Sequence, residues 1–262
     1  MNNNVSVIIP TNASRISIFN SIDSVRNQIY NHKIEIIVVV NGNKFNEEIL
    51  SKLKSVKDIK LLNSPKSNGN AARHLGVESS AFEILCFLDD DDLWVPNKLS
   101  YQVSKMIEDK AKFSYTGRLV KSPYRNYYTI SKPESSNLYL EIFQKNFIGG
   151  FSSIAIFKDL YYEIGGVDQN LGCFQDYEFY LRCFDKTNTV SIIDKPVVIY
   201  SQHFGIKISN NFDVNFKSTN YIITKYKKHQ HFIILKKSIK KMLFRKGLKY
   251  FNLKLVLFSF KL

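Results

Sequence analysis

An apolar run that ends in four consecutive carboxylates constrains the fold of this chain more than any other stretch. Residues 84–88 are apolar throughout, Asp follows at each position of 89–92, and Pro96 comes shortly after. An uninterrupted apolar run of this length is typical of a strand covered on both faces, as in a parallel sheet. Open α/β sheets bind their ligands at the carboxyl ends of such strands. The sequence therefore predicts a central strand whose end carries concentrated negative charge.

The acidic run itself has two interpretations. Four adjacent carboxylates repel one another, so a fold retains them only with compensation, for example from a hard divalent cation. The alternative is a solvated turn in which an Asp caps the helix that begins near Pro96. Runs of charge are usually solvated surface, so the local sequence leaves both interpretations open.

Strand-like and helix-like segments alternate along the first part of the chain. Strands are predicted at 5–10, 34–40, 59–62 and 84–88, and helices at 16–30, at 47–56 and from 68 onward. This alternation favours an α/β fold, with a mostly parallel sheet flanked by helices. Polar side chains follow three strand ends, namely Thr11, Asn41 and the acidic run. That edge of the sheet is the expected binding crevice.

The second half of the chain is less regular. We predict a helix from Pro96 to about Glu108, an irregular stretch at 121–137, strands at 112–116, 151–157, 190–193 and 197–200, a helix at 176–184, and helices after 212. No internal repeat or low-complexity linker interrupts this pattern. The simplest division is therefore one catalytic-type domain at 1–212 and a helical extension at 213–262.

The positive charge of the chain is concentrated at its C-terminal end. The net charge is +14, and residues 214–262 hold 13 Lys or Arg and no Asp or Glu. The basicity is thus a property of the tail, on a body that is nearly neutral. Three cysteines without metal-ligand spacing are expected to be reduced thiols. Because neither an export signal nor a spanning apolar run is seen, we expect a cytoplasmic protein.

Five segments, in their order along residues 5–205, resemble inverting glycosyltransferase family 2. These segments are 5–11, 35–43, 68–76, 87–96, and 165–168 together with 175–179. Each motif is weak alone, because short acidic and glycine motifs recur by chance, but their order at the ends of the predicted elements is specific. The resemblance implies the GT-A fold and a nucleotide-sugar donor. It also favours metal and nucleotide binding by the acidic run.

The family's Asp-x-Asp motif corresponds to Asp89, Asp90 and Asp91. The resemblance implies that Asp91 binds the metal, while Asp89 and Asp90 face the ribose and the waters of the metal, with Asp89 also close enough to act as a ligand. Asp92 is expected to cap the following helix. We expect Mn²⁺ or Mg²⁺, since all-oxygen sites suit these cations.

Two further residues match catalytic and phosphate-binding positions of the family. Asp176 matches the Asp of a Glu-Asp pair that acts as general base, although Gln175 replaces the Glu; the alternative is a carboxylate that only stabilises a helix N-terminus. Arg73 matches the arginine that binds the diphosphate, and the alternative is a solvated helix residue. His203 lies where relatives often carry a histidine near the diphosphate or metal, although a lone histidine is more often structural.

The nucleotide base is expected at the first two strand ends. The resemblance places Pro10 and Thr11 beside the nucleotide. Asn41 stands where relatives often have Asp, and its amide oxygen can still accept the imide hydrogen of uracil. We therefore expect a UDP-sugar as donor.

The tail has the pattern of a surface anchor. Residues 232–250 form a basic amphipathic helix with a stripe at Leu235, Ile239, Met242 and Leu243, which is typical of binding to anionic lipid. The alternative is a helix packed on the domain with a solvated basic face. Nucleic-acid binding is not expected, because no recognised motif accompanies the charge.

Together these features predict an inverting glycosyltransferase of the hexosyltransferase class. It would transfer a hexose or N-acetylhexosamine from a UDP-sugar to a lipid-linked oligosaccharide in O-antigen, capsule or lipopolysaccharide biosynthesis. It would work as a peripheral protein on the inner face of the cell membrane. The alternative is a catalytically silent nucleotide-sugar or glycan-binding module that the tail tethers to the membrane.

Overall fold

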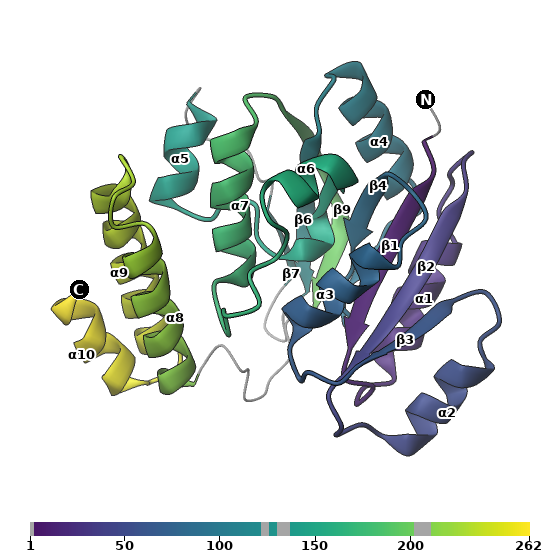
Figure 1. Ribbon diagram of the computed structural model, residues 1–262, viewed down its shortest axis with the longest axis horizontal. Coiled ribbons are helices and arrows are strands. Elements are labelled where there is room, and N and C mark those ends of the chain that lie inside the picture. The colour runs from purple at the N-terminus through teal and green to yellow at the C-terminus, as the bar shows by residue number, and fades with distance from the viewer. Residues whose placement is uncertain (1–2, 122–125, 130–136, 202–210) are drawn as a thin grey trace. The chain divides into compact units, whose positions relative to one another are not determined.

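The computed structural model describes residues 3–121, 126–129, 137–201 and 211–262. The chain divides into two compact units. The first unit comprises the described parts of 1–132, 148–167 and 186–203, and the second those of 133–147, 168–185 and 204–262. Within the described ranges, the first unit carries the strands and the second is helical (Figure 1). The predicted boundary between residues 212 and 213 stays a prediction.

The described residues of the first unit form a nine-stranded mixed sheet in the order β3-β2-β1-β4-β8-β6-β9-β5, with β7 paired to β6. The strands are β1 (Val5–Thr11), β2 (Ile34–Asn41), β3 (Lys60–Ser64), β4 (Ile84–Phe87), β5 (Leu93–Trp94), β6 (Phe113–Lys121), β7 (Asn126–Thr129), β8 (Ile154–Phe157) and β9 (Val190–Ser201). Strands β3, β2, β1 and β4 are parallel to one another, while β8 is antiparallel to both β4 and β6. The sheet is therefore mostly parallel where the sequence predicted it to be.

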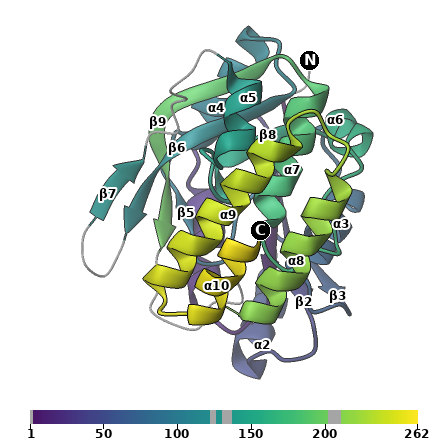
Figure 2. The same ribbon diagram turned by 90° about the vertical axis from the view of Figure 1, so that its left-hand side faces the viewer.

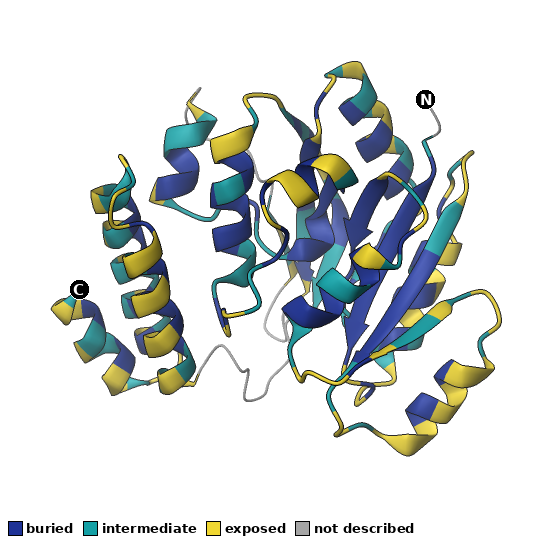
Figure 3. Ribbon diagram, viewed as in Figure 1, coloured by how far each residue is buried: buried dark blue, intermediate teal, exposed yellow. Residues whose placement is uncertain are grey.

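The centre of the sheet is the buried core of the first unit. Every residue of β1 and of β4 is buried, and the two strands pair in parallel from Val5 opposite Ile84 (Figure 3). Burial on both faces explains why these strands are apolar without alternation. The interpretation of 84–88 as a central strand is confirmed.

Five helices of the first unit lie between its strands in sequence: α1 (Ser17–Arg26), α2 (Glu47–Ser55), α3 (Gly69–Glu78), α4 (Lys98–Glu108) and α6 (Lys158–Glu163). Asn68 caps α3, because its side chain accepts hydrogen bonds from the backbone of Asn70 and Ala71. A Cβ at Gly76 would lie 2.5 Å from Ile8 Cγ2, so α3 approaches β1 as closely as a glycine permits. This contact fixes the helix that carries Arg73.

The second half differs from the prediction at several points: helices form at Leu138–Gln144 and Lys158–Glu163, where none was predicted, and two strand segments differ as well. Residues 151–153 form a 3₁₀ turn, η1 (Phe151–Ser153), before β8 instead of the start of a strand, and Ser153 Oγ donates to Gly150 O at 2.9 Å. The strands predicted at 190–193 and 197–200 are one strand, β9, whose register against β6 shifts around Gly117 and Pro196. Proline lacks the N–H that a regular ladder needs, which accounts for an irregularity at that point.

The second unit consists of α5 (Leu138–Gln144), α7 (Gln175–Lys186), α8 (Phe212–Lys225), α9 (Phe232–Lys249) and α10 (Leu253–Lys261). Helix α10 folds back against α9, and a Cβ at Gly247 would lie 2.6 Å from Val256 Cγ2 (Figure 2). The helices predicted after residue 212 are thus confirmed. Within the described ranges, no helix is both long and apolar enough to cross a bilayer.

The apolar stripe of α9 packs inside this unit. Leu235, Ile239 and Leu243 are at most 1% exposed. This is the packed-helix alternative for these three residues of the stripe, while the fourth, Met242, is half-buried. The exposed apolar side chains of the two last helices are different ones: Ile233, Leu248, Leu253, Leu257 and Phe260, with Phe251 between the helices.

Candidate functional site

The first strand end and the acidic run meet in the first unit. Thr11 Oγ1 donates to Asp90 Oδ2 at 2.5 Å, and Arg15 Nη1 lies 2.6 Å from Asp91 Oδ2. Burial raises the pKa of Asp90 to about 6; the Thr11 hydrogen bond opposes this rise, and the charges of Asp91 and Asp89 add to it. A carboxyl group with this pKa is about half protonated at pH 6, so it can donate as well as accept a hydrogen bond there.

Arg73 reaches the same acidic run from α3. Its side chain is 8% exposed, and its Nη2 lies 2.5 Å from Asp89 Oδ1. Its Nη1 donates to Asn70 Oδ1 at 3.3 Å, and the guanidinium lies over the Phe151 ring at 4.4 Å. The alternative of a solvated helix arginine is therefore wrong. Among the described residues Arg73 Nε is buried without a hydrogen-bond partner, so the guanidinium retains donor capacity.

The environment of Asp92 differs from those of Asp89, Asp90 and Asp91. It is 1% exposed, and its carboxylate accepts from Ser152 Oγ at 2.6 Å and from the Ser201 N–H at 3.1 Å. Burial raises the pKa of this carboxyl group. The predicted helix cap is wrong, because Asn97 occupies the N-cap position of α4 and the short strand β5 intervenes. Asp92 instead ties the acidic run to η1 and to the end of β9.

Ser152 holds both ends of the acidic run. Its hydroxyl accepts from the Asp89 N–H at 3.0 Å and donates to Asp92, while its carbonyl accepts from Trp94 Nε1 at 3.0 Å. Trp94 is 4% exposed and therefore serves as core packing. The sequence contained no signal for Ser152, which stands in a segment interpreted as a strand.

The other predicted nucleotide contacts lie at the ends of β1 and β2. Asn41 is partly exposed, and its Nδ2 donates to Thr11 O at 3.0 Å. This bond leaves the amide oxygen of Asn41 as the acceptor that a ligand can use. Pro10 is buried in β1 opposite Val39. The structure thus brings Thr11, Asn41 and the acidic run to one edge of the sheet, as predicted.

The donor set of this edge suits a metal that is shared with a ligand. Among the residues that the structure describes, no three His, Cys, Asp or Glu side chains are grouped to hold a metal ion by themselves. Asp89 and Asp91 offer hard oxygen atoms, and Mg²⁺ is commonly held by one or two carboxylates together with substrate phosphates. The residues present fit such a site. His203 lies outside the described residues.

Asp176 lies in the second unit, in the first turn of α7. The Tyr177 N–H donates to its Oδ1 at 2.8 Å, and Asn146 Nδ2 donates to its Oδ2 at 3.4 Å. Phe174 precedes the helix with φ +59°, a left-handed conformation that turns the chain sharply. Gln175, in the position of the family's Glu, donates from Nε2 to Leu171 O at 2.8 Å and so closes the loop before the helix.

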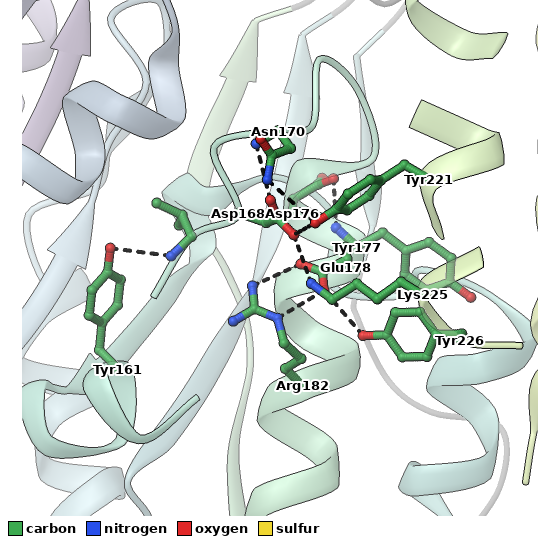
Figure 4. Close-up of polar contacts among 11 residues, drawn as sticks. Tyr161, Asp168, Asn170, Asp176, Tyr177, Glu178, Arg182, Tyr221, Lys225 and Tyr226 are labelled. Carbon is green, nitrogen blue, oxygen red and sulfur yellow. Dashed lines mark hydrogen bonds and ion pairs between the residues drawn. The ribbon is translucent and has the colours of Figure 1, made fainter. Parts of the chain in front are cut away.

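A buried ion-pair network joins α7 to the C-terminal helix α8 (Figure 4). Glu178 is fully buried, and it accepts from Arg182 Nη2 at 2.8 Å and from Tyr226 OH at 3.2 Å. Lys225 Nζ lies 2.8 Å from Glu178 Oε1 and 2.7 Å from Asp168 Oδ2. Sequence reasoning missed this network, because its partners are far apart in the chain.

Asp168 keeps its charge despite partial burial. Burial alone would raise its pKa, but hydrogen bonds from Lys225, the Asn170 N–H and Tyr221 outweigh it, so the pKa of Asp168 lies below its usual value. For Lys225, burial lowers the pKa, but the bonds to Asp168 and Glu178 leave a net rise. Both groups are therefore held in their charged forms.

The arrangement of the sheet is that of a GT-A glycosyltransferase. The chain superimposes on the structure of Staphylococcus aureus TarS 1–349 in complex with UDP-GlcNAc with a TM-score of 0.71 and 16% sequence identity, over 94% of this chain and 73% of the TarS 1–349 chain. At that identity the likeness defines the fold alone. Residues 6–165 match the family model described as glycosyl transferase family 2, and the chain belongs to that family.

Relatives with assigned names agree with this class. An uncharacterized glycosyltransferase of Haemophilus influenzae is 26% identical over 76% of this chain and 68% of its own length. The UDP-Glc:alpha-D-GlcNAc-diphosphoundecaprenol beta-1,3-glucosyltransferase WfgD of Escherichia coli is 33% identical to this chain where the two align. The alignment covers 42% of this chain and 44% of the length of WfgD. The family and the α/β fold predicted from the sequence are confirmed, and so is the enzyme class of glycosyltransferase.

Proposed function

We propose that this glycosyltransferase moves a hexose or N-acetylhexosamine, with inversion, from a UDP-sugar to a lipid-linked glycan. The observation that carries the proposal is the meeting of Thr11, Arg73 and the acidic run at one sheet edge. The name of the Escherichia coli relative specifies a UDP-glucose donor and a diphosphoundecaprenol-linked acceptor, and the Staphylococcus aureus neighbour was crystallised with UDP-GlcNAc. Both support a UDP-sugar as donor, and the name of the Escherichia coli relative supports the lipid-linked acceptor.

The diphosphate of the donor would be bound by the acidic edge and Arg73. Asp91, with Asp89 beside it, would hold Mn²⁺ or Mg²⁺, and the metal would neutralise the charge that develops on the leaving diphosphate. Arg73 has an unused buried N–H and a rigid setting against Phe151, which suits it to phosphate oxygens. Arg15 would release Asp91 when the metal binds. His203 is proposed as a further contact to the metal or diphosphate.

The nucleoside would lie along the ends of the first two strands. Asn41 would accept the uracil imide hydrogen through its amide oxygen, since its nitrogen is engaged by Thr11 O. Pro10 and Thr11 would form the wall beside the base. Asp90 would bind the ribose, and its raised pKa allows its carboxyl group to donate as well as accept. These contacts would position the donor for attack at its anomeric carbon.

Asp176 is proposed as the general base. In-line displacement needs a carboxylate that accepts the proton of the acceptor hydroxyl as the new bond forms. The backbone N–H of Tyr177 and the amide of Asn146 hold one oxygen each, so the carboxylate has a defined orientation. Its position at the start of α7 stabilises the charged form through the helix dipole.

We also propose that the enzyme works at the inner face of the cell membrane, in O-antigen, capsule or lipopolysaccharide biosynthesis. The acceptor named for the Escherichia coli relative is itself lipid-linked. The C-terminal helices carry 13 Lys or Arg and no acidic residue beyond Val214, and anionic lipid attracts such segments. Their exposed apolar residues, with Phe251 at 97% exposure, would enter the interface.

A donor screen followed by a transfer assay tests this function. A donor that binds only the folded state raises the melting temperature, so the full chain is heated with Mn²⁺ and each UDP-sugar in turn. The stabilising donor is then offered with a polyprenyl-diphosphate-linked sugar, and wild type is compared with Asp91→Asn and the exposed control Glu48→Gln. We expect transfer by wild type and control only. Donor binding without hydrolysis or transfer against any lipid-linked acceptor would instead favour the silent binding module.

A further inference from the structure

A pocket of about 400 Å³ lies between α5 and α9 in the second unit, where the two helices run side by side (Figure 2). Its lining includes Glu141 and Lys145 from the end of α5, and Ser238, Lys241 and Arg245 from α9. Three cations and one carboxylate give it an excess of positive charge. The volume lies within the range of small-molecule sites, which is about 300–1,000 Å³.

The one carboxylate of this pocket is already engaged. Glu141 has a side chain that is 3% exposed, and its Oε1 lies 3.1 Å from Lys145 Nζ. Among the described residues, neither Lys241 nor Arg245 takes part in an ion pair. The pocket therefore combines Lys145, which pairs with Glu141, and two exposed cations for which the described residues provide no ion pair. A charged ligand with several acceptor oxygens would complete it.

Four cations along α9 also repel one another. Lys237, Lys241, Arg245 and Lys249 follow one another at intervals of four residues and are all exposed. Like charges one turn apart destabilise a helix, and no acidic residue follows Asp213 in the sequence to offset them. A bound dianion would relieve this repulsion, whereas water and salt only screen it.

We propose that the pocket between α5 and α9 binds the phosphate or diphosphate head group of a lipid. Arg245 supplies a planar fork for phosphate oxygens, and Lys145 and Lys241 supply point charges from either side. A lipid is favoured over a soluble phosphate because α10, which packs on α9, exposes Leu253 at 68% and Phe260 at 64%, and the turn between the two helices exposes Phe251 at 97%. The second unit would thus offer cations to the phosphate of the lipid and apolar side chains to its hydrocarbon. The inference rests on the proposed lipid-linked acceptor and names the part of the chain that meets it.

The test measures binding of the full chain to vesicles by flotation. Phosphatidylcholine vesicles contain either a polyprenyl phosphate or, at matched surface charge, phosphatidylserine. The variant Lys241→Gln/Arg245→Gln is compared with Lys254→Gln/Lys261→Gln, which removes the same charge from α10. On polyprenyl phosphate, we expect the pocket variant to lose at least about tenfold more affinity than the control, since it also loses charge-assisted hydrogen bonds. On phosphatidylserine, we expect the two variants to behave alike.

Two results would overturn the inference. Equal losses in both variants on polyprenyl phosphate would mean that the basic surface only adsorbs to anionic lipid. A third arm titrates the protein with inorganic diphosphate. If wild type binds diphosphate and the pocket variant does not, while wild type shows no preference for polyprenyl phosphate vesicles, the ligand is a soluble phosphate. If the protein prefers vesicles with polyprenyl phosphate and free diphosphate competes with them, the lipid site is supported.

The outcome is separable from the proposed function. Stabilisation by UDP-sugar and Mn²⁺ depends on the first unit, so the pocket variant is expected to keep it, which also verifies its folding. If vesicle binding shows no dependence on Lys241 and Arg245 while transfer to a soluble acceptor persists, only the lipid-phosphate site is wrong. If wild type binds polyprenyl phosphate but no nucleotide sugar, the site stands and the proposed transferase activity does not.

Discussion

Arg15 lies 2.6 Å from Asp91, so a cation of the chain itself neutralises the carboxylate proposed to bind the metal. Arg15 is half exposed, with 53% of its side chain accessible, and an exposed pair of this kind is worth about 0–1 kcal/mol. A divalent ion beside a diphosphate can therefore displace it. Arg15 acts as a removable counter-charge that prevents repulsion within the acidic run while no metal is bound.

Replacing this counter-charge should strengthen metal binding. In Arg15→Gln, Mn²⁺ no longer competes with the guanidinium, and we expect its affinity in the presence of UDP to rise by up to about fivefold. Titration calorimetry measures this change. Arg26→Gln is the control, because Arg26 pairs with Asp58 away from the acidic run. Weaker Mn²⁺ binding in Arg15→Gln would show that Arg15 contacts the nucleotide instead.

The metal should bind together with the nucleotide. The described residues offer no group of three metal-binding side chains, and a metal held by only one or two carboxylates also relies on substrate phosphates. We expect Mn²⁺ alone to leave the melting temperature unchanged and to raise it strongly when UDP is present. A large shift with Mn²⁺ and no UDP would mean that the protein forms a complete metal site.

Loss of Ser152 should weaken the acidic run from both ends. Ser152→Ala removes a hydrogen bond to the buried carboxylate of Asp92 and the acceptor of the Asp89 N–H. Leaving these groups without a partner should cost about 1–3 kcal/mol in the free energy of unfolding, which urea denaturation measures. Ser153→Ala is a matched control, since its hydroxyl bonds only to backbone carbonyls. Equal costs for both variants would argue against a special role for Ser152.

Asp176→Asn should abolish transfer without loss of donor binding. The amide keeps the shape of the side chain but cannot accept the acceptor's proton, and general base catalysis contributes about 10²- to 10⁴-fold. We expect kcat to fall by that factor while the melting-temperature shift with UDP-sugar and Mn²⁺ is retained. The neighbouring Glu178 is unsuitable as a control because it is buried, so exposed Asp185→Asn serves. Full activity of Asp176→Asn would place the base elsewhere.

The stability of the second unit should depend on pH through Asp168. The pKa of Asp168 is depressed in the folded state, so its contribution is present above its unfolded pKa of about 3.9 and is lost as the pH falls through the folded value. Lys225, whose pKa is raised, contributes below about pH 10.4 and loses that contribution as the pH rises through its folded value.

Removing Lys225 should flatten this dependence. We expect Lys225→Gln to lose about 1–3 kcal/mol near neutral pH, because it breaks charge-assisted bonds to Asp168 and Glu178. Its unfolding free energy should also fall less than that of wild type between pH 5 and the acid limit, as chemical denaturation at each pH measures. Lys52→Gln, which breaks an exposed pair with Glu48, is the control. If the unfolding free energies of Lys225→Gln and wild type changed with pH in parallel, Asp168 would not be the source of the pH dependence.

The local sequence was sufficient to predict the strands in the parallel half of the sheet. Strands β1, β2 and β4 are largely apolar because both faces are covered, so the pattern that specifies them lies within each strand. The positions of Thr11 and Asn41 followed from this, because parallel strands end at a common edge. Arg73 was identified only through the family resemblance, and its burial against Phe151 could not be read from an arginine in a helix.

Long-range polar pairs could not be predicted. Asp92 and Ser152 are 60 residues apart, and Glu178 and Tyr226 are 48 apart. Serine, aspartate and lysine occur at many exposed positions, so their sequence gives no sign of which partner they meet. The capping role assigned to Asp92 failed for this reason, since a local rule was applied to a residue with distant partners. Strand β5, with two residues, is similarly defined only by β9.

Ser152 has a practical consequence for protein engineering. The acidic run is supported by β1 through Thr11, by α3 through Arg73, and by η1 through Ser152. Transplanting the four aspartates alone onto the strand end of another scaffold would therefore recreate the charge but neither its neutralisation nor its shape. A functional graft must carry all of these supports, so the smallest transferable module is most of the first unit.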